Sequence, residues 1–164
     1  MSLHRDLLAQ ATHLASKEPK KPKQASLRRA VSVAYYALFH FLIDESSRFL
    51  VSGSSNDRRK LRDAIARSFA HAQMKNTSQA FAGRGGHPWK DLFPVPPDLA
   101  TIAQTFVDMQ QERHEADYDL SRKFVRSEVL ALIVRAQYAV DRWPAVAASE
   151  ASRAYLIGLL VNTK

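Results

Sequence analysis

The sequence contains no cysteine, which excludes disulfide scaffolds, thiolate nucleophiles and cysteine-based zinc or iron–sulfur sites. No apolar run approaches the roughly 18 residues that a membrane-spanning helix needs. The first six residues lack the basic segment and apolar stretch of a secretion signal. We therefore expect a cytoplasmic protein that makes no contact with a membrane.

Glycine is scarce, at 5 of 164 residues, and three of these five lie together at Gly83, Gly85 and Gly86. Runs of Val, Ile and Thr with period-two alternation are also missing, whereas Ala, Leu, Arg and Gln recur at helical spacing. This pattern predicts an all-α protein. With 46% hydrophobic residues, the chain can bury a core as a single domain over residues 1–164.

Apolar periodicity predicts six helices joined mostly by short turns. We expect them over residues 3–16, 24–50, 57–83, 98–119, from after Ser121 to Trp143–Pro144, and 149–161. Four long helices with short helices at the two ends favour an antiparallel up-and-down bundle. In the 57–83 helix, the expected buried stripe is Leu61, Ile65, Phe69 and Ala72.

Residues 84–97 form a Gly/Pro-rich insertion that cannot be regular structure, since its last four positions include three prolines. The segment also carries Trp89, Leu92 and Phe93, which are costly to leave exposed. We therefore expect an ordered loop that folds back and covers these side chains.

Positive charge exceeds negative charge. Lys and Arg number 24 against 16 Asp and Glu, which gives a formal net charge of +8. Such an excess favours polyanionic partners, of which nucleic acid is the commonest, although a solvated basic surface has the same composition.

Arg113 occupies an unusual place in the predicted 98–119 helix. If Ile102 sets the reference direction, Arg113 points only about 20° away, in the middle of the apolar stripe. A guanidinium in a core needs a partner, and Asp117, Glu128 or an external anion can supply it. Two interpretations follow. Arg113 either belongs to a structural ion-pair network or binds phosphate beside His114, which can move protons near neutral pH.

Two segments of the chain resemble the HEPN family (higher eukaryotes and prokaryotes nucleotide-binding domains). Residues 27–40, which read LRRAVSVAYYALFH, resemble the family's first long helix, and residues 113–119, RHEADYD, resemble the motif before its last long helix. The ending at residues 134–140, VRAQYAV, fits as well. The resemblance covers about residues 24–143.

The resemblance implies a helical bundle that often pairs as a homodimer. Many members are metal-independent ribonucleases that act as toxins or antiphage effectors, and small members often accompany a nucleotidyltransferase-fold antitoxin. The family's active pattern is an Arg, four to six residues, and a His. Arg113 matches the Arg, but the three eligible His positions hold Tyr118, Asp119 and Leu120.

Two functions are therefore considered. The chain binds RNA or a nucleotide and cleaves RNA without a metal, or it is a non-catalytic module that binds a nucleotide or a partner protein. No metal site or cofactor motif is present in the sequence. The candidate catalytic residues are Arg113, His114 and His40. The candidate RNA- or nucleotide-binding residues are Arg113, Asp117, Tyr118, Tyr36 and Arg29.

Overall fold

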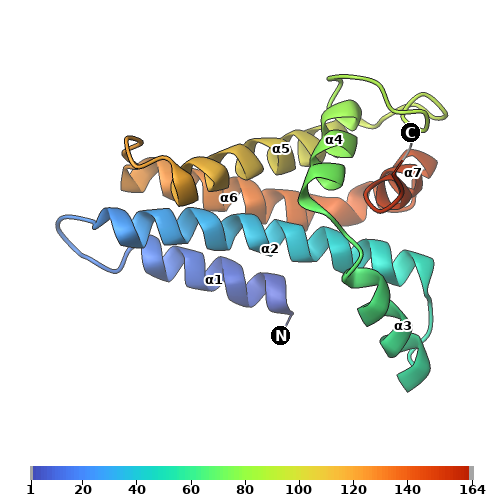
Figure 1. Cartoon of the computed structure of the whole chain (residues 1–164), viewed down its shortest axis with the longest axis horizontal. Coiled ribbons are helices and arrows are strands. Elements are labelled where there is room, and N and C mark those ends of the chain that lie inside the picture. The colour runs from blue at the N-terminus through green and yellow to red at the C-terminus, as the bar shows by residue number, and fades with distance from the viewer. Residues whose placement is uncertain (1, 163–164) are drawn as a thin grey trace. The chain divides into compact units, whose positions relative to one another are not determined.

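The described part of the chain is built from helices alone. The computed structural model describes residues 2–162, and these residues form seven α-helices and one short 3-10 helix, with no β-strand (Figure 1). In chain order the helices are α1 (Leu3–Ala15), α2 (Gln24–Leu50), α3 (Asn56–Ala66), α4 (His71–Phe81), α5 (Pro97–Tyr118), α6 (Arg126–Arg142), η1 (Trp143–Ala145) and α7 (Glu150–Gly158). The all-α prediction is confirmed for residues 2–162. None of the helices in that range has the length and apolar character needed to cross a membrane.

The helices belong to two compact units. The first unit contains the chain up to Phe41 and Thr105–Asp141, and the second contains Leu42–Gln104 and the chain from Arg142 onward. Helices α2 and α5 each contribute residues to both units.

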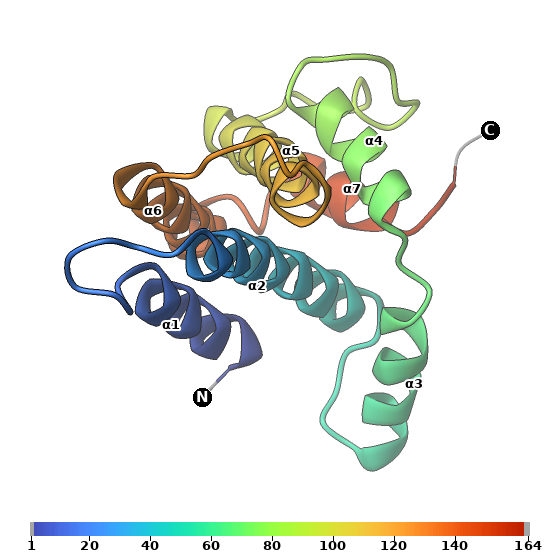
Figure 2. The same cartoon turned by 60° about the vertical axis from the view of Figure 1, so that its left-hand side comes forward.

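In the first unit, α2 and α5 run antiparallel. The Ser32 hydroxyl of α2 lies 2.7 Å from a carboxylate oxygen of Asp117, near the end of α5. Further along α2, the ring of Tyr35 lies 5.6 Å from that of Phe106, near the start of this unit's part of α5. Helices α1 and α2 lie side by side, as do α5 and α6 (Figures 1 and 2). Their facing sides bury the apolar residues Leu8, Ala11, Leu27, Ala30, Val31, Ala34, Leu38, Met109, Val129, Leu132 and Ala136.

In the second unit, α4 packs against α7 through buried polar contacts as well as apolar ones. The Thr77 hydroxyl donates a hydrogen bond to the carbonyl oxygen of Gly158 at 2.7 Å. The Ser78 and Tyr155 hydroxyls lie 2.9 Å apart, and the Tyr155 ring lies 5.2 Å from that of Phe81. Because these buried hydroxyls bond to one another or to a carbonyl oxygen, α4 and α7 can pack closely without leaving the hydroxyl groups unpaired.

Most predicted helix limits agree with the structure. The 24–50 prediction matches α2, and the 98–119 prediction differs from α5 by one residue at each end. Helix α6 starts at Arg126, later than predicted, because the segment after α5 is held in a separate turn. Helix α7 ends at Gly158, before the predicted end at residue 161.

The prediction of one helix over residues 57–83 is wrong, because the structure divides this segment into α3 and α4. Helix α3 ends at Ala66, and α4 begins after Ala70, whose backbone is extended at φ −120° and ψ 135°. Between them, the Ser68 hydroxyl donates to the carbonyl oxygen of Ala64 at 3.5 Å. Serine side chains that bond local carbonyls in this way compete with helix propagation.

The buried stripe predicted for that helix is also wrong. Helix α3 buries no residue, Leu61 is 49% exposed, and Ala72 in α4 is exposed. The buried side of α4 is instead formed by Met74, Thr77, Ser78, Ala80 and Phe81. A single helical period cannot describe the segment, because α4 buries one of its faces whereas α3 buries none.

Residues 84–96 contain no regular helix, as the prolines predict, but their apolar side chains are not covered as expected. Leu92 is 60% exposed and Phe93 is 39% exposed, so the prediction is wrong for both. The turn instead buries His87, whose backbone oxygen accepts from the Lys90 amide at 3.1 Å. Burial lowers the pKa of His87, so its ring is neutral near pH 7 and can be packed against α7.

At Gly158, α7 approaches its neighbours closely, and Gly158→Ala tests that approach. A Cβ atom there would lie 3.0 Å from Thr77 Cγ2 and 3.2 Å from His87 Cε1. We expect the substitution to lower the free energy of unfolding by about 1–3 kcal/mol, although alanine normally favours a helix. Chemical denaturation measures the change. Gly86→Ala is the matched control, because its Cβ would meet no atom within 4 Å. Equal stability of the two variants would contradict the packing described here.

Candidate functional site

Arg113 lies in the apolar stripe of α5, as its helical phase predicts. Its side chain is only 12% exposed, and its guanidinium carbon lies 5.1 Å from the centre of the Tyr35 ring. Its Nη1 atom lies 3.6 Å from Asp117 Oδ2, and the Ser32 hydroxyl donates to Asp117 Oδ1 at 2.7 Å. These four residues, Arg113, Asp117, Ser32 and Tyr35, form what we call the Arg113 cluster.

The Arg113 guanidinium keeps unused hydrogen-bonding capacity. Its Nε atom is buried and has no hydrogen-bond partner among residues 2–162. The 3.6 Å separation from Asp117 compensates the charge but is too long for a hydrogen bond. Burial raises the pKa of Tyr35, while the charge of Arg113 and a hydrogen bond with it act in the opposite direction. The phenol is therefore neutral, and Asp117 is the negative charge that the cluster supplies.

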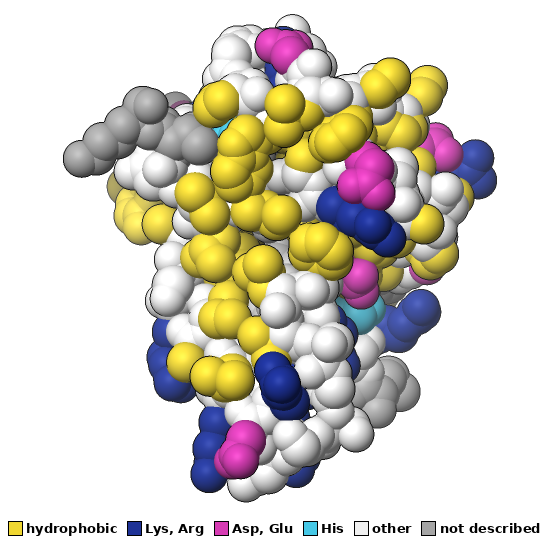
Figure 3. Space-filling model, turned by 90° about the vertical axis from the view of Figure 1, so that its right-hand side faces the viewer, with side chains coloured by type: hydrophobic (Ala, Val, Ile, Leu, Met, Phe, Trp, Pro, Cys, Tyr) yellow, Lys and Arg dark blue, Asp and Glu magenta, His cyan; other side chains and the backbone are white. Residues whose placement is uncertain are grey.

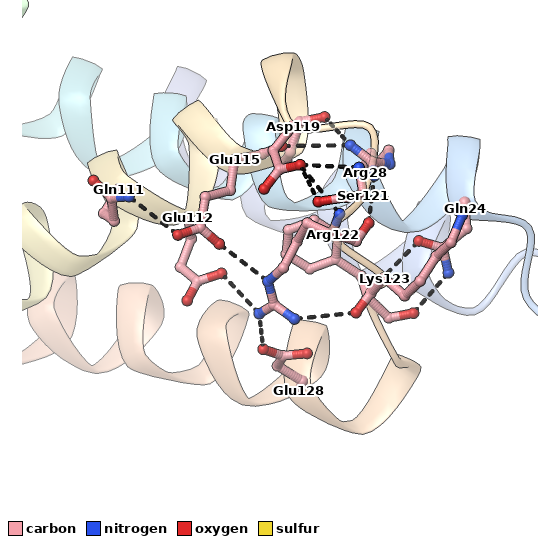
Figure 4. Close-up of polar contacts among 12 residues, drawn as sticks. Gln24, Arg28, Gln111, Glu112, Glu115, Asp119, Ser121, Arg122, Lys123 and Glu128 are labelled. Atoms are coloured by element: carbon pink, nitrogen blue, oxygen red, sulfur yellow. Dashed lines mark hydrogen bonds and ion pairs between the residues drawn. The ribbon is translucent and has the colours of Figure 1, made fainter.

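A second cluster is centred on Arg122, in the turn that follows α5, and contains two carboxylates of α5 and one of α6. Arg122 donates from Nε to Glu115 Oε2 at 3.0 Å and from Nη2 to Glu128 Oε1, and its Nη2 lies 3.4 Å from Glu112 Oε2 (Figure 4). The guanidinium carbon of Arg122 also lies 4.5 Å from the centre of the Phe124 ring. We call Arg122, Glu112, Glu115 and Glu128 the Arg122 cluster.

The Arg122 cluster holds three carboxylates around one cation. Hydrogen bonding to Glu128 raises the pKa of Arg122, which therefore stays charged. Desolvation raises the pKa of Glu112, and the neighbouring charges of Glu115 and Glu128 act in the same direction while Arg122 opposes them. These ion pairs connect α6 to the end of α5. The Arg122 guanidinium is the cation that balances the charge of the three carboxylates.

Side chains of α2 also form hydrogen bonds with the backbone at the end of α5 and in the turn that follows it. Arg28 donates to the carbonyl oxygens of Ala116, at 2.9 Å, and of Arg122 (Figure 4). The Gln24 side chain donates to the Phe124 carbonyl at 2.7 Å and accepts from the Phe124 amide at 3.0 Å. The segment between α5 and α6 is therefore bonded to α2 at both its ends.

Asp119 closes the turn that follows α5. Its Oδ1 atom accepts from the Ser121 amide at 2.9 Å and from the Ser121 hydroxyl at 2.6 Å. The hydrogen bond from the Ser121 side chain is the main cause that lowers the pKa of Asp119. This residue therefore has a local structural role as the acceptor of a turn.

Two predicted site residues of α2 adjoin the Arg113 cluster. The ring of Tyr36 lies 5.3 Å from that of Tyr35 and is stacked with the ring of His40 at 6.1 Å. Desolvation lowers the pKa of His40, which favours its neutral form. Ser32, Tyr36 and His40 are spaced four residues apart and so share one face of the helix.

Three other predicted residues lie outside the Arg113 cluster. His114 is exposed, and its ring lies 5.0 Å from that of Tyr118, which is itself 68% exposed. One residue further along an α-helix turns the side chain by about 100°, which explains why His114 faces away from Arg113. Arg29 is exposed on α2. Of the partners considered for Arg113, Asp117 is correct, and Glu128 pairs with Arg122 instead.

Sequence reasoning missed Arg122 and Arg28. The sequence nevertheless indicates that a cation is needed near this point, because acidic residues are concentrated at the C-terminal end of α5, where the helix dipole is also negative. Those acidic residues are Glu112, Glu115, Asp117 and Asp119. Such an end needs positive charge from nearby chain, and Arg122 in the following turn provides it.

Comparison of the chain with protein-family models, with curated proteins and with solved structures finds no match in any of the three. Within residues 2–162, no group of three or more His, Asp and Glu side chains is placed to hold a metal ion.

Replacement of Arg122 by methionine tests the Arg122 cluster. Arg122→Met leaves three partly buried carboxylates without their cation, so we expect the free energy of unfolding to fall by about 1–3 kcal/mol at pH 7. The pKa of Glu112 is already raised in the folded state, and without Arg122 it rises further. As the pH falls, the folded variant therefore binds more protons than its unfolded chain does. Its loss of unfolding free energy relative to the wild type should accordingly become smaller towards pH values of about 4–5.

Denaturation at several pH values measures this effect. Arg135→Met is the matched control, since it removes a more exposed ion pair with Asp108 at 2.6 Å. Exposed pairs contribute at most about 1 kcal/mol. A deficit for Arg122→Met that does not depend on pH would contradict the charge balance described here.

Proposed function

We propose that this chain is a HEPN-like helical module that binds RNA or a nucleotide through a phosphate group at Arg113. One observation carries the proposal. A mostly buried guanidinium has a Nε atom without a hydrogen-bond partner among residues 2–162, and its carboxylate neighbour is 3.6 Å away. A phosphate oxygen can accept from an arginine in this state with little loss of existing bonds.

Charge and aromatic side chains support the same proposal. The formal net charge of +8 favours association with a polyanion. Tyr36 lies beside Tyr35 and offers a ring on which a base can stack. Asp117, held by Ser32, can hydrogen bond to a ribose or base donor next to the phosphate.

The proposal extends to architecture and assembly. We propose that α1, α2, α5 and α6 form an up-and-down bundle, which the antiparallel contacts between α2 and α5 support. The resemblance further suggests a homodimer and a nucleotidyltransferase-fold antitoxin as partner, in a toxin–antitoxin or phage-defence pair. These assignments rest on the HEPN-like motifs at residues 27–40 and 113–119.

Binding of a labelled single-stranded RNA, followed by fluorescence anisotropy, tests the main proposal. Arg113→Met should weaken binding by about tenfold or more, because a charge-assisted hydrogen bond is lost. Its stability should change less than that of Arg122→Met, since Asp117 keeps its bond from Ser32. The wild-type affinity should fall steeply between about 50 and 200 mM salt.

Arg135→Met removes the same charge from an exposed pair and serves as the control. Equal RNA affinity of the two variants would remove Arg113 from the binding site.

A second candidate function is metal-independent cleavage of RNA, and His40 is the observation that favours it. A neutral imidazole can accept a proton from a ribose 2′-hydroxyl, and burial lowers the pKa of His40 towards this form. His40 lies five residues beyond Tyr35, the residue beneath Arg113, which is about 7.5 Å along the helix axis. A bound RNA strand would have to reach both residues.

Incubation of the purified protein with short RNA oligonucleotides tests cleavage. If the second candidate is correct, cleavage persists in EDTA and leaves 2′,3′-cyclic phosphate ends. His40→Ala should then slow it by about 10²–10⁴-fold, the usual contribution of proton transfer. His114→Ala should have a much smaller effect, because its ring faces away from the cluster. Absence of cleavage at high protein concentration, with and without divalent metal, leaves the non-catalytic function.

A further inference from the structure

Helix α3 is anomalous in the second unit because it buries none of its residues. An 11-residue helix is too short to be stable in water by propensity alone, which needs at least about 12–15 residues. Capping contributes, since Ser55 accepts from the Arg58 amide, and Arg62 donates to the Val51 and Gly53 carbonyls. Figures 1 and 2 show α3 standing apart from α4 and α7. Most of the surface of α3 therefore remains accessible to another molecule.

The same unit has an apolar groove with a volume of about 370 Å³. It is bordered by the exposed end of α2, the 84–96 loop and α7, through the apolar residues Phe49, Trp89, Leu92, Phe93, Ala154 and Ile157. Two charged residues of α7, Glu150 and Arg153, also line it, and they pair with each other at 3.0 Å, so the groove itself carries no net charge. Phe49 is 40% exposed and Leu92 is 60% exposed. Leu50, which follows Phe49 in α2, is also 39% exposed. Large exposed side chains gathered in this way are typical of an interaction surface rather than of scattered surface residues.

Positive charge accompanies this apolar surface. In Figure 3 hydrophobic side chains form a band on this face, and Lys and Arg side chains lie at its lower end as well as beside it. Helix α3 carries Arg58, Arg59, Lys60 and Arg62 but only Asp57 and Asp63. The Lys60–Asp57 pair is 3.9 Å apart and highly exposed, so it neutralises little of this charge.

We propose that the groove and α3 together bind an acidic amphipathic helix of a partner protein. The apolar face of that helix would occupy the groove, and its carboxylates would face Arg58, Arg59 and Lys60. A recessed groove lined by aromatic and aliphatic side chains accepts the anchor residues of a helix. RNA would leave most of this apolar surface uncovered, and a flat membrane surface would not fill a recess.

The test uses two synthetic peptides of about four helical turns with the same leucine positions. One carries glutamate on its polar face and the other carries lysine. Binding is followed by anisotropy of the labelled peptide and by the fluorescence of Trp89. The other tryptophan, Trp143, is only 2% exposed and donates to Glu45, so it should not respond.

The acidic peptide should bind saturably and shift the Trp89 emission to shorter wavelength. Leu92→Asp should raise its Kd by about tenfold or more through loss of an apolar contact, at little risk to folding because Leu92 is exposed. The double variant Arg58→Glu with Arg59→Glu should raise Kd comparably, with a weaker dependence on salt. Lys20→Glu with Lys21→Glu, in the connector between α1 and α2, is the matched charge control and should leave Kd unchanged.

Three other results would overturn the proposal. The first is no saturable binding of the acidic peptide, or equal binding of the basic peptide. The second is tighter binding of a single-stranded RNA or of phosphatidylserine vesicles with the same pattern across the variants, which would assign the surface to nucleic acid or lipid. The third is a wild-type dimer that Leu92→Asp converts to monomer without an effect on the peptide, which would make a second copy of the chain the occupant.

Discussion

The interaction on which the candidate site depends is the contact of Arg122 with three carboxylates. Arg122 pairs with Glu112 and Glu115 of α5 and with Glu128 of α6, and so fixes the end of the helix that carries Arg113 and Asp117. Arg113 pairs with Asp117, which also accepts a hydrogen bond from the Ser32 hydroxyl. Two arginines nine positions apart in the sequence thus have different roles. Each side-chain nitrogen of Arg122 has a hydrogen-bond partner, whereas Arg113 keeps a buried Nε atom without a partner among the described residues.

Helix content and most helix limits could be predicted from the sequence because they depend on local periodicity and on proline. The prediction for α2 is correct to the residue, since a long apolar face identifies it without reference to partners. The break between α3 and α4 could not be predicted in this way. The apolar period continues through Ser68, and only the tertiary environment determines that α4 is buried while α3 is not. The exposure of Leu92 could not be predicted from local periodicity either. It depends on which side chain of the 84–96 loop packs against α7.

The candidate site was predictable in part. The helical phase of Arg113 identified a buried guanidinium, and the i+4 spacing identified Asp117 as its partner. Ser32 and Tyr35 come from a helix more than 75 residues earlier in the chain, so no local pattern links them to Arg113. The sequence pattern predicts a helix that starts at Arg122, although this residue lies in a turn that Asp119 closes. Long-range pairing of this kind is fixed by the packing of α2 against α5, which periodicity does not specify.

The geometry at the end of α5 also restricts where catalysis can arise. Position 120 would lie beneath Arg113 if the helix continued, because seven residues make almost two full turns. Helix α5 ends at Tyr118, however, and Leu120 is 85% exposed within the turn that Asp119 closes. A histidine placed at position 119 or 120 would therefore be directed by this turn and not by the helix. In the proposed cleavage, a histidine that accepts the proton would therefore come from another helix, and the half-buried His40 of α2, whose lowered pKa favours the neutral form, is the residue proposed for that role.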